Sequence, residues 1–313
     1  MSDRGRLARL GLVGIGKIAR DQHLPALAAS PDFALVAAAS RQATLDGLPA
    51  FGDIEAMLAD GPPLDAVSIC TPPAGRDAIG RAAIAAGKHV MLEKPPGATS
   101  ADVAALGELA EGTGVTLFAT WHSREASGVD AARVWLAGRT VFRATITWRE
   151  DIRVWHPGQE WIMDAHGFGV FDPGINALSI ATATLPGDLC VEGGTMTVPK
   201  NRASPIAAAI ALRLGGAAPV MLDLNFLQTG PQRWDIAVET NDGMLELTDG
   251  GKRLFVNGEE QAVAGGPGEY PRLYARFAAL IRAGESDVDL RPLRLVEDIF
   301  RIACRERSEA FHF

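Results

Sequence analysis

The sequence predicts an α/β protein with an N-terminal, doubly wound parallel sheet and a C-terminal α+β domain with a mostly antiparallel sheet. The chain has 313 residues, which is long for one hydrophobic core and suits two. Short apolar runs alternate with helical segments as far as residue 122, and beyond it most apolar runs follow one another directly. We therefore place one domain at residues 1–122 and the second at 123–313.

The first domain alternates strands and helices. We expect strands over 7–13, 34–39, 65–70, 89–92 and 115–120, and helices over 18–29, 54–59, 76–86 and from Thr99, which forms a capping box with Asp102. Because crossovers between parallel strands are right-handed, the carboxyl ends of all these strands meet at one edge, where ligands bind.

The second domain begins with a helix and continues mainly with strands. We expect helices over 129–136, 175–184, 270–283 and 292–307, and strands over 141–148, 207–214, 220–226, 234–240 and 244–249. A loop rich in Trp, His, Gly and Pro covers 151–171. Asn241-Asp242-Gly243 and Asn257-Gly258 are typical hairpin turns.

Composition and charge exclude several classes of protein. The formal net charge is −8 and no basic run could neutralise a row of phosphates, so we expect no nucleic-acid partner. The three cysteines are far apart, which indicates neither a disulfide framework nor a metal cluster. With no secretory leader and no apolar run of about 18 residues, we expect a cytoplasmic protein without a membrane partner or a bound metal.

The first strand runs into the turn Gly-Ile-Gly-Lys-Ile-Ala at 14–19. The first glycine permits a tight turn, the second lets the backbone approach a pyrophosphate, and the small Ala19 lets the helix pack closely. The helix N-terminus then offers N–H groups to phosphates. A Gly-rich chain can form such a turn for structural reasons alone, but its place after the first strand favours a Rossmann dinucleotide site contacted by Gly14, Gly16, Lys17 and Ile18.

The end of the second strand indicates which cofactor is used. An NAD-binding strand usually ends in a carboxylate that binds the ribose hydroxyls, whereas this one ends in Ala39-Ser40-Arg41. Ser40 can donate a hydrogen bond to a 2′-phosphate, and Arg41 can pair with it or stack on adenine. Arg41 can also be an ordinary solvated surface residue. We predict that NADP is accepted at least as well as NAD.

A lysine follows the strand 89–92, in the sequence Glu93-Lys94-Pro95-Pro96-Gly97. An isolated lysine is usually a solvated charge, but a lysine at the carboxyl edge of a Rossmann strand points into the cofactor crevice. The prolines stiffen this loop and can include a cis bond.

These motifs together resemble the glucose–fructose oxidoreductase/inositol dehydrogenase (Gfo/Idh/MocA) family. The resemblance covers the first half of the chain and rests on the turn at 14–19, Cys70-Thr71-Pro72-Pro73, Ala86-Gly87-Lys88-His89-Val90, Glu93-Lys94-Pro95 and Asp172-Pro173-Gly174-Ile175-Asn176. It implies that Lys94 contacts both substrate and nicotinamide, and that Thr71, Pro72 and Glu93 belong to the cofactor site.

Many members of this family carry Asp-x-Gly-x-His where this chain has Asn176 as the last residue. Asparagine cannot act as a general base. This variant, together with Trp121-His122, Trp148-Arg149-Glu150 and Trp155-His156, is similar to the branch that contains bacterial L-arabinose and D-galactose 1-dehydrogenases. That branch implies a catalytic pair, Lys94 and Asp172. It also implies that sugar hydroxyls are bound by His122, Glu150, His156 and Asn176.

Oxidation of an aldopyranose at C1 requires a base for the anomeric hydroxyl while hydride leaves for nicotinamide C4. Lys94 and Asp172 can share this work, and the sequence leaves open which takes the proton. Asp172 and Asn176 are four residues apart, on one helical face. Asp172 before Pro173 is also a good helix N-cap.

Trp155 can cover the apolar face of a pyranose, or simply pack in a core.

The sequence thus predicts NAD(P)-dependent oxidation of an L-arabinose-, D-galactose- or D-fucose-type sugar to its lactone. Alternatives are a family oxidoreductase acting on another polyol or carbonyl, and a non-catalytic NADP-binding sensor. We also expect that the sheet of the second domain can join two copies in a homodimer.

Overall fold

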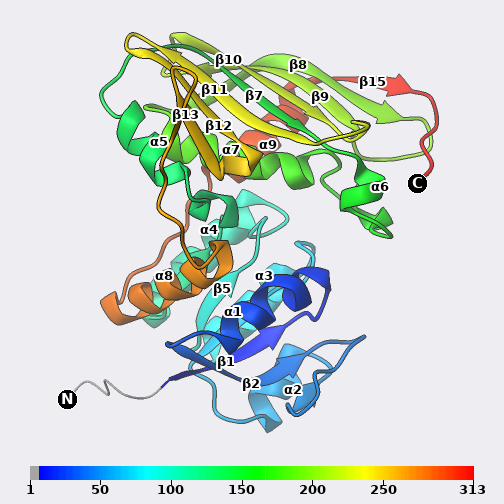
Figure 1. Ribbon diagram of the computed structural model, residues 1–313. Coiled ribbons are helices and arrows are strands. Elements are labelled where there is room, and N and C mark those ends of the chain that lie inside the picture. The colour runs from blue at the N-terminus through cyan, green and yellow to red at the C-terminus, as the bar shows by residue number, and fades with distance from the viewer. Residues whose placement is uncertain (1–6, 166) are drawn as a thin grey trace. The chain divides into compact units, whose positions relative to one another are not determined.

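The structure is a computed structural model that describes residues 7–165 and 167–313 (Figure 1). Residue 166, in the loop expected at 151–171, and residues 1–6 lie outside the described part. The chain divides into two compact units. The first comprises residues up to 122 together with 267–290, and the second comprises 123–266 and 291–313.

The first unit is built on a parallel sheet with the strand order β3-β2-β1-β4-β5-β6. The strands are β1 Ala8–Val13, β2 Phe33–Ala39, β3 Ala50–Phe51, β4 Ala66–Ile69, β5 His89–Leu92 and β6 Leu117–Ala119. The order runs outward from β1 and β4 in opposite directions, which confirms the doubly wound sheet. Strand β3 was not predicted, because two residues are too short for a periodic signal.

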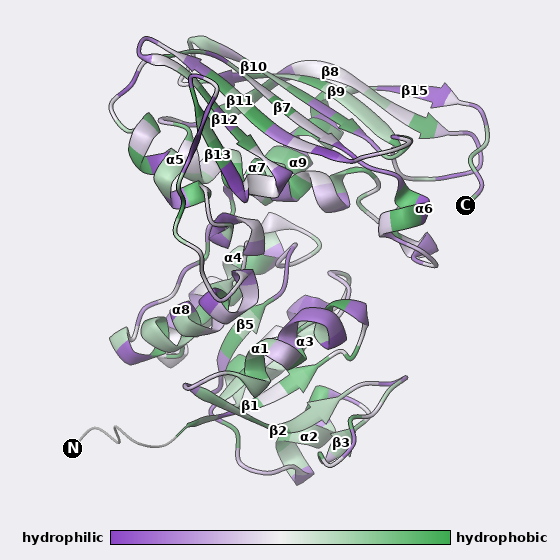
Figure 2. Cartoon of the chain, in the orientation of Figure 1, coloured by the Kyte–Doolittle hydropathy of each residue, from purple (hydrophilic) through white to green (hydrophobic). Residues whose placement is uncertain are grey.

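The helices of the first unit flank this sheet, whose central strands are strongly hydrophobic (Figure 2). They are α1 Leu24–Ala28, α2 Ile54–Asp60, α3 Arg76–Ala85 and α4 Ser100–Thr113. The Thr99 hydroxyl accepts a hydrogen bond from the Asp102 N–H at 3.1 Å and donates to its carboxylate at 2.7 Å, so the predicted cap is present. A wide, π-helical turn, η1 at Ala19–His23, precedes α1. It accommodates Pro25, which lacks an N–H and crowds the preceding helical turn.

Helix α8, Glu269–Ala283, belongs to the first unit, although the sequence analysis assigned residues 267–290 to the second domain. One face of α8 packs into a core that it shares with strands of the parallel sheet, and Phe277 stacks on Phe33 with ring centroids 5.4 Å apart. The amphipathic pattern of the helix predicts which side is apolar. It does not indicate which domain provides the matching surface, and this caused the error.

The second unit contains a mostly antiparallel sheet, as predicted, with the order β14-β13-β12-β11-β7-β10-β9-β8-β15. Among the described strand pairs of this second sheet, only β7–β10 and β8–β15 are parallel. The strands are β7 Val141–Arg149, β8 Leu189–Pro199, β9 Ala207–Leu214, β10 Ala218–Asn225, β11 Arg233–Thr240, β12 Gly243–Thr248, β13 Arg253–Val256, β14 Glu259–Gln261 and β15 Cys304–Ser308. Both predicted hairpin turns are present, at 241–242 and at Asn257-Gly258.

Several parts of the second unit differ from the expected elements. Strand β8 was not predicted, because its two adjacent glycines disturb the alternating pattern. The final helix ends at Ile302 instead of 307, and the following residues form β15 along β8. The residues Arg305, Glu306 and Arg307 are good helix formers, so pairing with a sheet edge overrides their local preference.

The helices of the second unit are α5 Val129–Leu136, α6 Ile152–Trp155, α7 Phe171–Thr184 and α9 Arg291–Ile302. Short 3₁₀ turns occur at His122–Glu125, Glu160–Met163 and Asp249–Gly251. The expected loop 151–171 therefore contains α6 and one such turn. Helix α7 starts one turn earlier than expected, with Val170 as its N-cap. The reading of Asp172 as an N-cap is consequently wrong.

Alternate residues of β9 and β10 are buried, as expected for a sheet with one covered face. On the outward face, Met221 and Met244 are 49% and 39% exposed. The homodimer expected through this sheet stays a prediction. No helix within 7–165 and 167–313 combines the length and apolar character needed to cross a membrane.

Because α8 completes the core of the first unit, we expect Phe277→Ala to lower the free energy of unfolding by about 3–5 kcal/mol. Phe277 is 0% exposed and its ring fills space between Phe33 and Phe118. Urea denaturation measures the loss. The matched control, Val134→Ala on the exposed side of α5, should change stability by less than about 0.5 kcal/mol. Equal effects of the two substitutions would contradict the assignment of α8.

Candidate active site

The residues predicted to bind the cofactor lie at the carboxyl edge of the parallel sheet. Gly14 follows β1 with φ +92°, and a Cβ there would lie 2.7 Å from the Thr71 backbone nitrogen, so only glycine fits. A Cβ on Gly16 would meet no atom within 4 Å. Internal packing does not require that second glycine, whereas a close ligand does. The Thr71 hydroxyl is buried without a hydrogen-bond partner among the described residues. A dinucleotide's phosphates fit this open, donor-bearing edge.

Two other residues of the phosphate turn have local partners. The Ile18 side chain packs against the buried cluster of Leu12, Ala19 and Cys70, so it can offer a ligand only its backbone. Lys17 is exposed and forms an ion pair with Asp21, four residues on. Such an exposed pair contributes little to stability, so the Lys17 ammonium can exchange partners readily.

The Ser40-Arg41 segment follows β2 at the same edge. The Ser40 hydroxyl accepts a hydrogen bond of 3.3 Å from the Gln42 N–H and keeps its own proton to donate. Arg41 is exposed and forms no ion pair with any residue that the structure describes. Pro72, beside Thr71, is also exposed. Their contacts with a cofactor stay predictions.

The turn that carries Lys94 follows β5 and contains a cis peptide bond between Lys94 and Pro95. The side chain of Arg76, only 2% exposed, donates hydrogen bonds to the carbonyl oxygens of Thr71, Glu93 and Pro95. Backbone on both sides of Lys94 is therefore held by one guanidinium. The sequence analysis placed Arg76 in a helix and gave it no role in the site.

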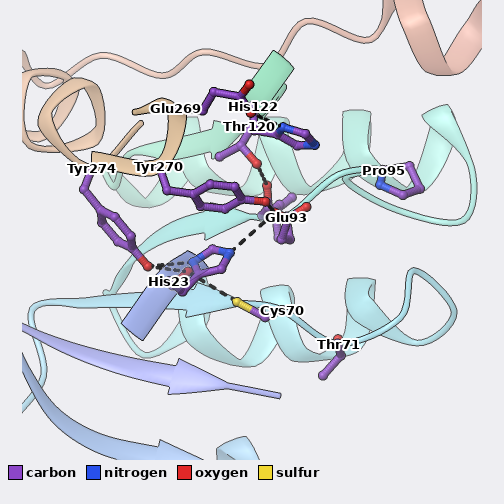
Figure 3. A network of polar contacts seen from close by, with 12 residues as sticks. His23, Cys70, Thr71, Glu93, Pro95, Thr120, His122, Glu269, Tyr270 and Tyr274 are labelled. Carbon is purple, nitrogen blue, oxygen red and sulfur yellow. Dashed lines mark hydrogen bonds and ion pairs between the residues drawn. The ribbon is translucent and has the colours of Figure 1, made fainter. Parts of the chain in front are cut away.

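The Glu93 carboxylate lies inside the first unit (Figure 3). Its Oε1 accepts a hydrogen bond from the Tyr270 hydroxyl and lies 3.4 Å from His23 Nε2. Burial alone would raise the pKa of Glu93, but the hydrogen bond and charge of His23, the charge of His122 and the Tyr270 hydrogen bond lower it to about 2. The partners of the Glu93 carboxylate are internal, and its predicted contact with the cofactor stays a prediction.

His23 was left without a role by the sequence analysis, although it lies on the helix that begins at the phosphate turn. Its Nδ1 is 2.8 Å from the Tyr274 hydroxyl oxygen, and its edge faces the Tyr270 ring at 4.8 Å between centroids. Burial alone would lower the pKa of His23, but the acidic groups of Cys70, Tyr274 and Glu93 raise it well above its usual value. The network has no local sequence signal, because Tyr270 and Tyr274 are some 250 residues away.

His122 stands where the first unit ends, directly after β6 and Thr120-Trp121. Its Nδ1 is 2.7 Å from a carboxylate oxygen of Glu269, and its ring stacks on Tyr270 at 5.5 Å between centroids. The carboxylate and the tyrosine fix the orientation of the imidazole. Substrate binding by His122 stays a prediction.

In the second unit, the structure brings together Glu150 and His156. Glu150 follows β7 and is buried, with Oε1 2.7 Å from His156 Nε2 and Oε2 accepting a 2.8 Å hydrogen bond from Trp234 Nε1. The sequence analysis missed Trp234. A carboxylate and an imidazole can also be two ligands of a metal ion. The described residues, however, contain no group of three or more His, Cys, Asp or Glu side chains that could hold one.

Three indole rings gather beside this carboxylate. Trp234 stacks on Trp148 with centroids 5.6 Å apart, and Trp155 tilts against Trp234 at 4.6 Å. Trp148 is buried, whereas Trp155 is 41% exposed. Trp155 therefore keeps part of its aromatic surface exposed, whereas Trp148 is packed inside the unit. Substrate binding by Trp155 stays a prediction.

Asp172 and Asn176 lie on one turn of α7, and Asp172 is 7% exposed. Between them, a Cβ on Gly174 would lie 2.6 Å from the Leu224 side chain, so glycine lets this turn pack closely on β10. Leu224 pairs with Trp148 of β7, and the Glu150 N–H donates to the carbonyl of Asn225 at 2.9 Å. The turn with Asp172 thus packs on the strands that lead to Glu150. Lys94 belongs to the first unit, and its pairing with Asp172 stays a prediction.

A phosphate turn at the switch point of a parallel sheet, with a second unit that gathers carboxylate, imidazole and indole groups, defines a two-domain oxidoreductase of the Rossmann type. Residues 8–120 match the model of the Gfo/Idh/MocA oxidoreductase family, which has an NAD-binding Rossmann fold. Together with the full-length likeness described next, this match shows that the chain belongs to that family.

The similarity to several other proteins extends over nearly the whole chain. It is 44% identical over 316 residues to a galactose 1-dehydrogenase from Pseudomonas fluorescens, covering 97% of this chain and 98% of the relative. It matches the crystal structure of a D-galactose-1-dehydrogenase from Rhizobium etli with a TM-score of 0.93 and 49% identity, covering 98% of each chain. A 3-ketoreductase from Actinomadura kijaniata, solved with TDP-benzene and NADP, gives a TM-score of 0.83 at 20% identity over 97% of this chain and 100% of that one, which shows a shared fold.

The low pKa of Glu93 predicts how its contribution to stability depends on pH. A carboxylate whose pKa falls from 4.5 to about 2 on folding stabilises the protein above pH 4.5, and this stabilisation disappears as the pH falls through 2. Near pH 7 we expect Glu93→Gln to be less stable than wild type by about 3 kcal/mol. The gap should close between pH 4.5 and 2 in denaturation curves.

Glu108→Gln, which changes an exposed carboxylate of α4 in the same unit, is the matched control and should show no such gap. A gap for Glu93→Gln that stays constant down to pH 2 would contradict the assigned charge.

Proposed function

We propose that the protein oxidises an aldopyranose of the D-galactose, L-arabinose or D-fucose type at C1 to the aldonolactone, with a nicotinamide dinucleotide as hydride acceptor. The observation that carries this proposal is the Glu150 carboxylate, held by His156 and Trp234 beside the exposed face of Trp155. Fixed acceptors next to an aromatic surface suit a pyranose, which has hydroxyls at its rim and a C–H face. The two relatives named galactose 1-dehydrogenases support the same substrate class.

The proposed roles in sugar binding follow from hydrogen-bonding capacity. Each Glu150 oxygen accepts one protein hydrogen bond and retains a lone pair for a sugar hydroxyl. The donors on His156 and Trp234 fix the carboxylate before the sugar arrives, so little ordering is needed on binding. Asn176 and His122 are proposed as further hydroxyl partners, and Trp155 as the surface for the C–H face.

The bound cofactor would supply hydride acceptance at nicotinamide C4, and the protein must supply a base and an orientation. We assign these two tasks to Lys94 and Asp172. One accepts the proton of the anomeric hydroxyl and the other holds that hydroxyl in line. The backbone around Lys94 is held by Arg76, so its side chain starts from a fixed point, which favours a reactive geometry.

We expect Lys94→Ala and Asp172→Ala each to lower kcat by roughly 10²- to 10⁴-fold, because each removes a group that moves or orients the proton. NADPH formation at 340 nm with a panel of aldoses measures this. Lys88→Ala changes a half-buried lysine at the other end of β5, and Asp188→Ala changes an exposed aspartate before β8. Both are matched controls and should retain wild-type kcat.

Near wild-type kcat in both Lys94→Ala and Asp172→Ala would refute the catalytic pair. No turnover of any aldose by the wild type, together with tight NADPH binding, would refute the proposed function and favour a sensor.

We further propose that NADP is used at least as well as NAD. Support comes from Ser40, whose hydroxyl can donate to a 2′-phosphate, from the exposed Arg41, and from the lack of a carboxylate at the end of β2. A 2′-phosphate gains a charge-assisted hydrogen bond from a guanidinium, whereas a ribose hydroxyl gains much less.

Arg41→Ala should therefore lower kcat/KM for NADP by roughly 10- to 100-fold and change the value for NAD little. Arg81→Ala, an exposed arginine on α3, is the control and should change neither value. A strong preference for NAD that Arg41→Ala leaves unaltered would contradict the cofactor proposal.

A further inference from the structure

A buried acid–base network lies directly beside the turn that carries Lys94, and the proposed function gives it no role. Glu93, His23, Tyr270 and Tyr274 are each 3% exposed or less, and all four belong to the first unit (Figure 3). Burial of ionisable groups is unfavourable unless they are paired and hydrogen-bonded. Packing alone would be served better by apolar side chains of similar size.

The hydrogen bonds in this network have a consistent direction. The Tyr270 hydroxyl donates to Glu93 Oε1, and His23 Nε2 faces the same atom. The Tyr274 hydroxyl donates to Ser68 Oγ at 3.4 Å, so its oxygen presents lone pairs to His23 Nδ1 at 2.8 Å. Every contact is satisfied when His23 carries a proton on both nitrogens and Glu93 carries none.

The pKa directions agree with this assignment, because the pKa of Glu93 is lowered to about 2 and that of His23 is raised well above its usual value. Besides the two tyrosines, four titratable side chains face the pair or its turn. They are Cys70 after β4, His122 after β6, Glu269 at the start of α8, and Arg76 of α3, which binds the Glu93 carbonyl.

The pair also joins two functional segments. His23 ends the turn η1, which continues the helix that begins at the phosphate turn. Glu93 directly precedes Lys94, and Arg76 donates hydrogen bonds to the carbonyl oxygens of Glu93 and Pro95, the residues before and after that lysine. The pair therefore ties the helix at the cofactor edge to the lysine turn.

We propose that His23 is a positioning residue: as a cation paired with Glu93, it fixes the turn that carries Lys94 and neutralises the carboxylate next to that lysine. The proposal rests on the proposed function, in which Lys94 and Asp172 handle the proton of the substrate. His23 does not touch the substrate in this scheme.

A charge-pairing role has a signature that a purely structural role lacks. His23→Gln leaves the Glu93 charge uncompensated, so groups nearby hold protons more tightly and the pH–rate profile moves to higher pH. Glu93→Gln leaves the imidazolium uncompensated over the pH range in which His23 keeps its proton, and this moves the profile to lower pH. The sign is the same whichever of Lys94 and Asp172 takes the proton.

The test compares pH profiles of kcat for the wild type, both single variants and the double variant. We expect opposite shifts of at least roughly half a pH unit in the single variants, and a return toward the wild-type midpoint in the double variant. His89→Gln is the matched control, because His89 lies at the other end of β5 and accepts a 2.9 Å hydrogen bond from Thr116 N–H. Its profile should coincide with that of the wild type.

A second readout needs no activity. Nitrogen NMR of the histidine rings in the cofactor-free protein should show His23 as an imidazolium well above the usual pKa of a histidine, and the pKa of this ring should be lower in Glu93→Gln. Should His23→Gln fail to fold, Tyr270→Phe removes one donor to Glu93 and no charge. That variant should lower kcat without moving the profile.

The outcomes separate the two proposals. If the wild type oxidises no sugar, the proposed function fails, while NMR still decides whether His23 is charged. If sugar is oxidised but His23 is neutral, or if the two single variants shift the profile in the same direction or not at all, the positioning role is overturned.

Discussion

The turn after β5 is the constraint on which the first unit's site depends. The Arg76 guanidinium binds the carbonyl oxygens of Glu93 and Pro95 in this turn and a third carbonyl in the segment after β4. The Glu93 carboxylate is held by His23 and Tyr270. Removing either partner of a buried pair leaves a charge without compensation, typically at a cost of several kcal/mol. The turn therefore has one well-defined conformation, and Lys94 extends from it.

Much of the first unit could be predicted from the sequence because its determinants are local. The Gly-x-Gly turn after an apolar run and the helix cap at Thr99 are each determined by residues that are close together in the sequence. Helix α8 could not be assigned, because its partners Phe33 and Phe118 are more than 150 residues away. Strand β15 was missed for a related reason, since its pairing with β8 outweighs the helical preference of Arg305 to Arg307.

The candidate site divides in the same way. Lys94 and Glu150 could be recognised as candidates because each directly follows a predicted strand. His156 was indicated by the family resemblance. Trp234 lies 84 residues from Glu150 in sequence, and Tyr270 lies 177 residues from Glu93. A tryptophan or tyrosine in a regular element carries no local sign that its polar atom reaches a distant carboxylate. Single candidate residues can therefore be proposed from the sequence, whereas their hydrogen-bond partners are found only in the structure.

Two carboxylate–imidazole pairs of this chain show how exposure decides the use of one chemical motif. In both pairs, an aromatic side chain donates a further hydrogen bond to the carboxylate. Tyr270 donates to Glu93, and Trp234 donates to Glu150. The His23 side chain is 1% exposed, while that of His156 is 16% exposed and lies beside the open face of Trp155. A sealed pair can act only through charge and position. A pair with an accessible edge can exchange hydrogen bonds with a ligand, so the second suits recognition and the first suits support of the residue next to it.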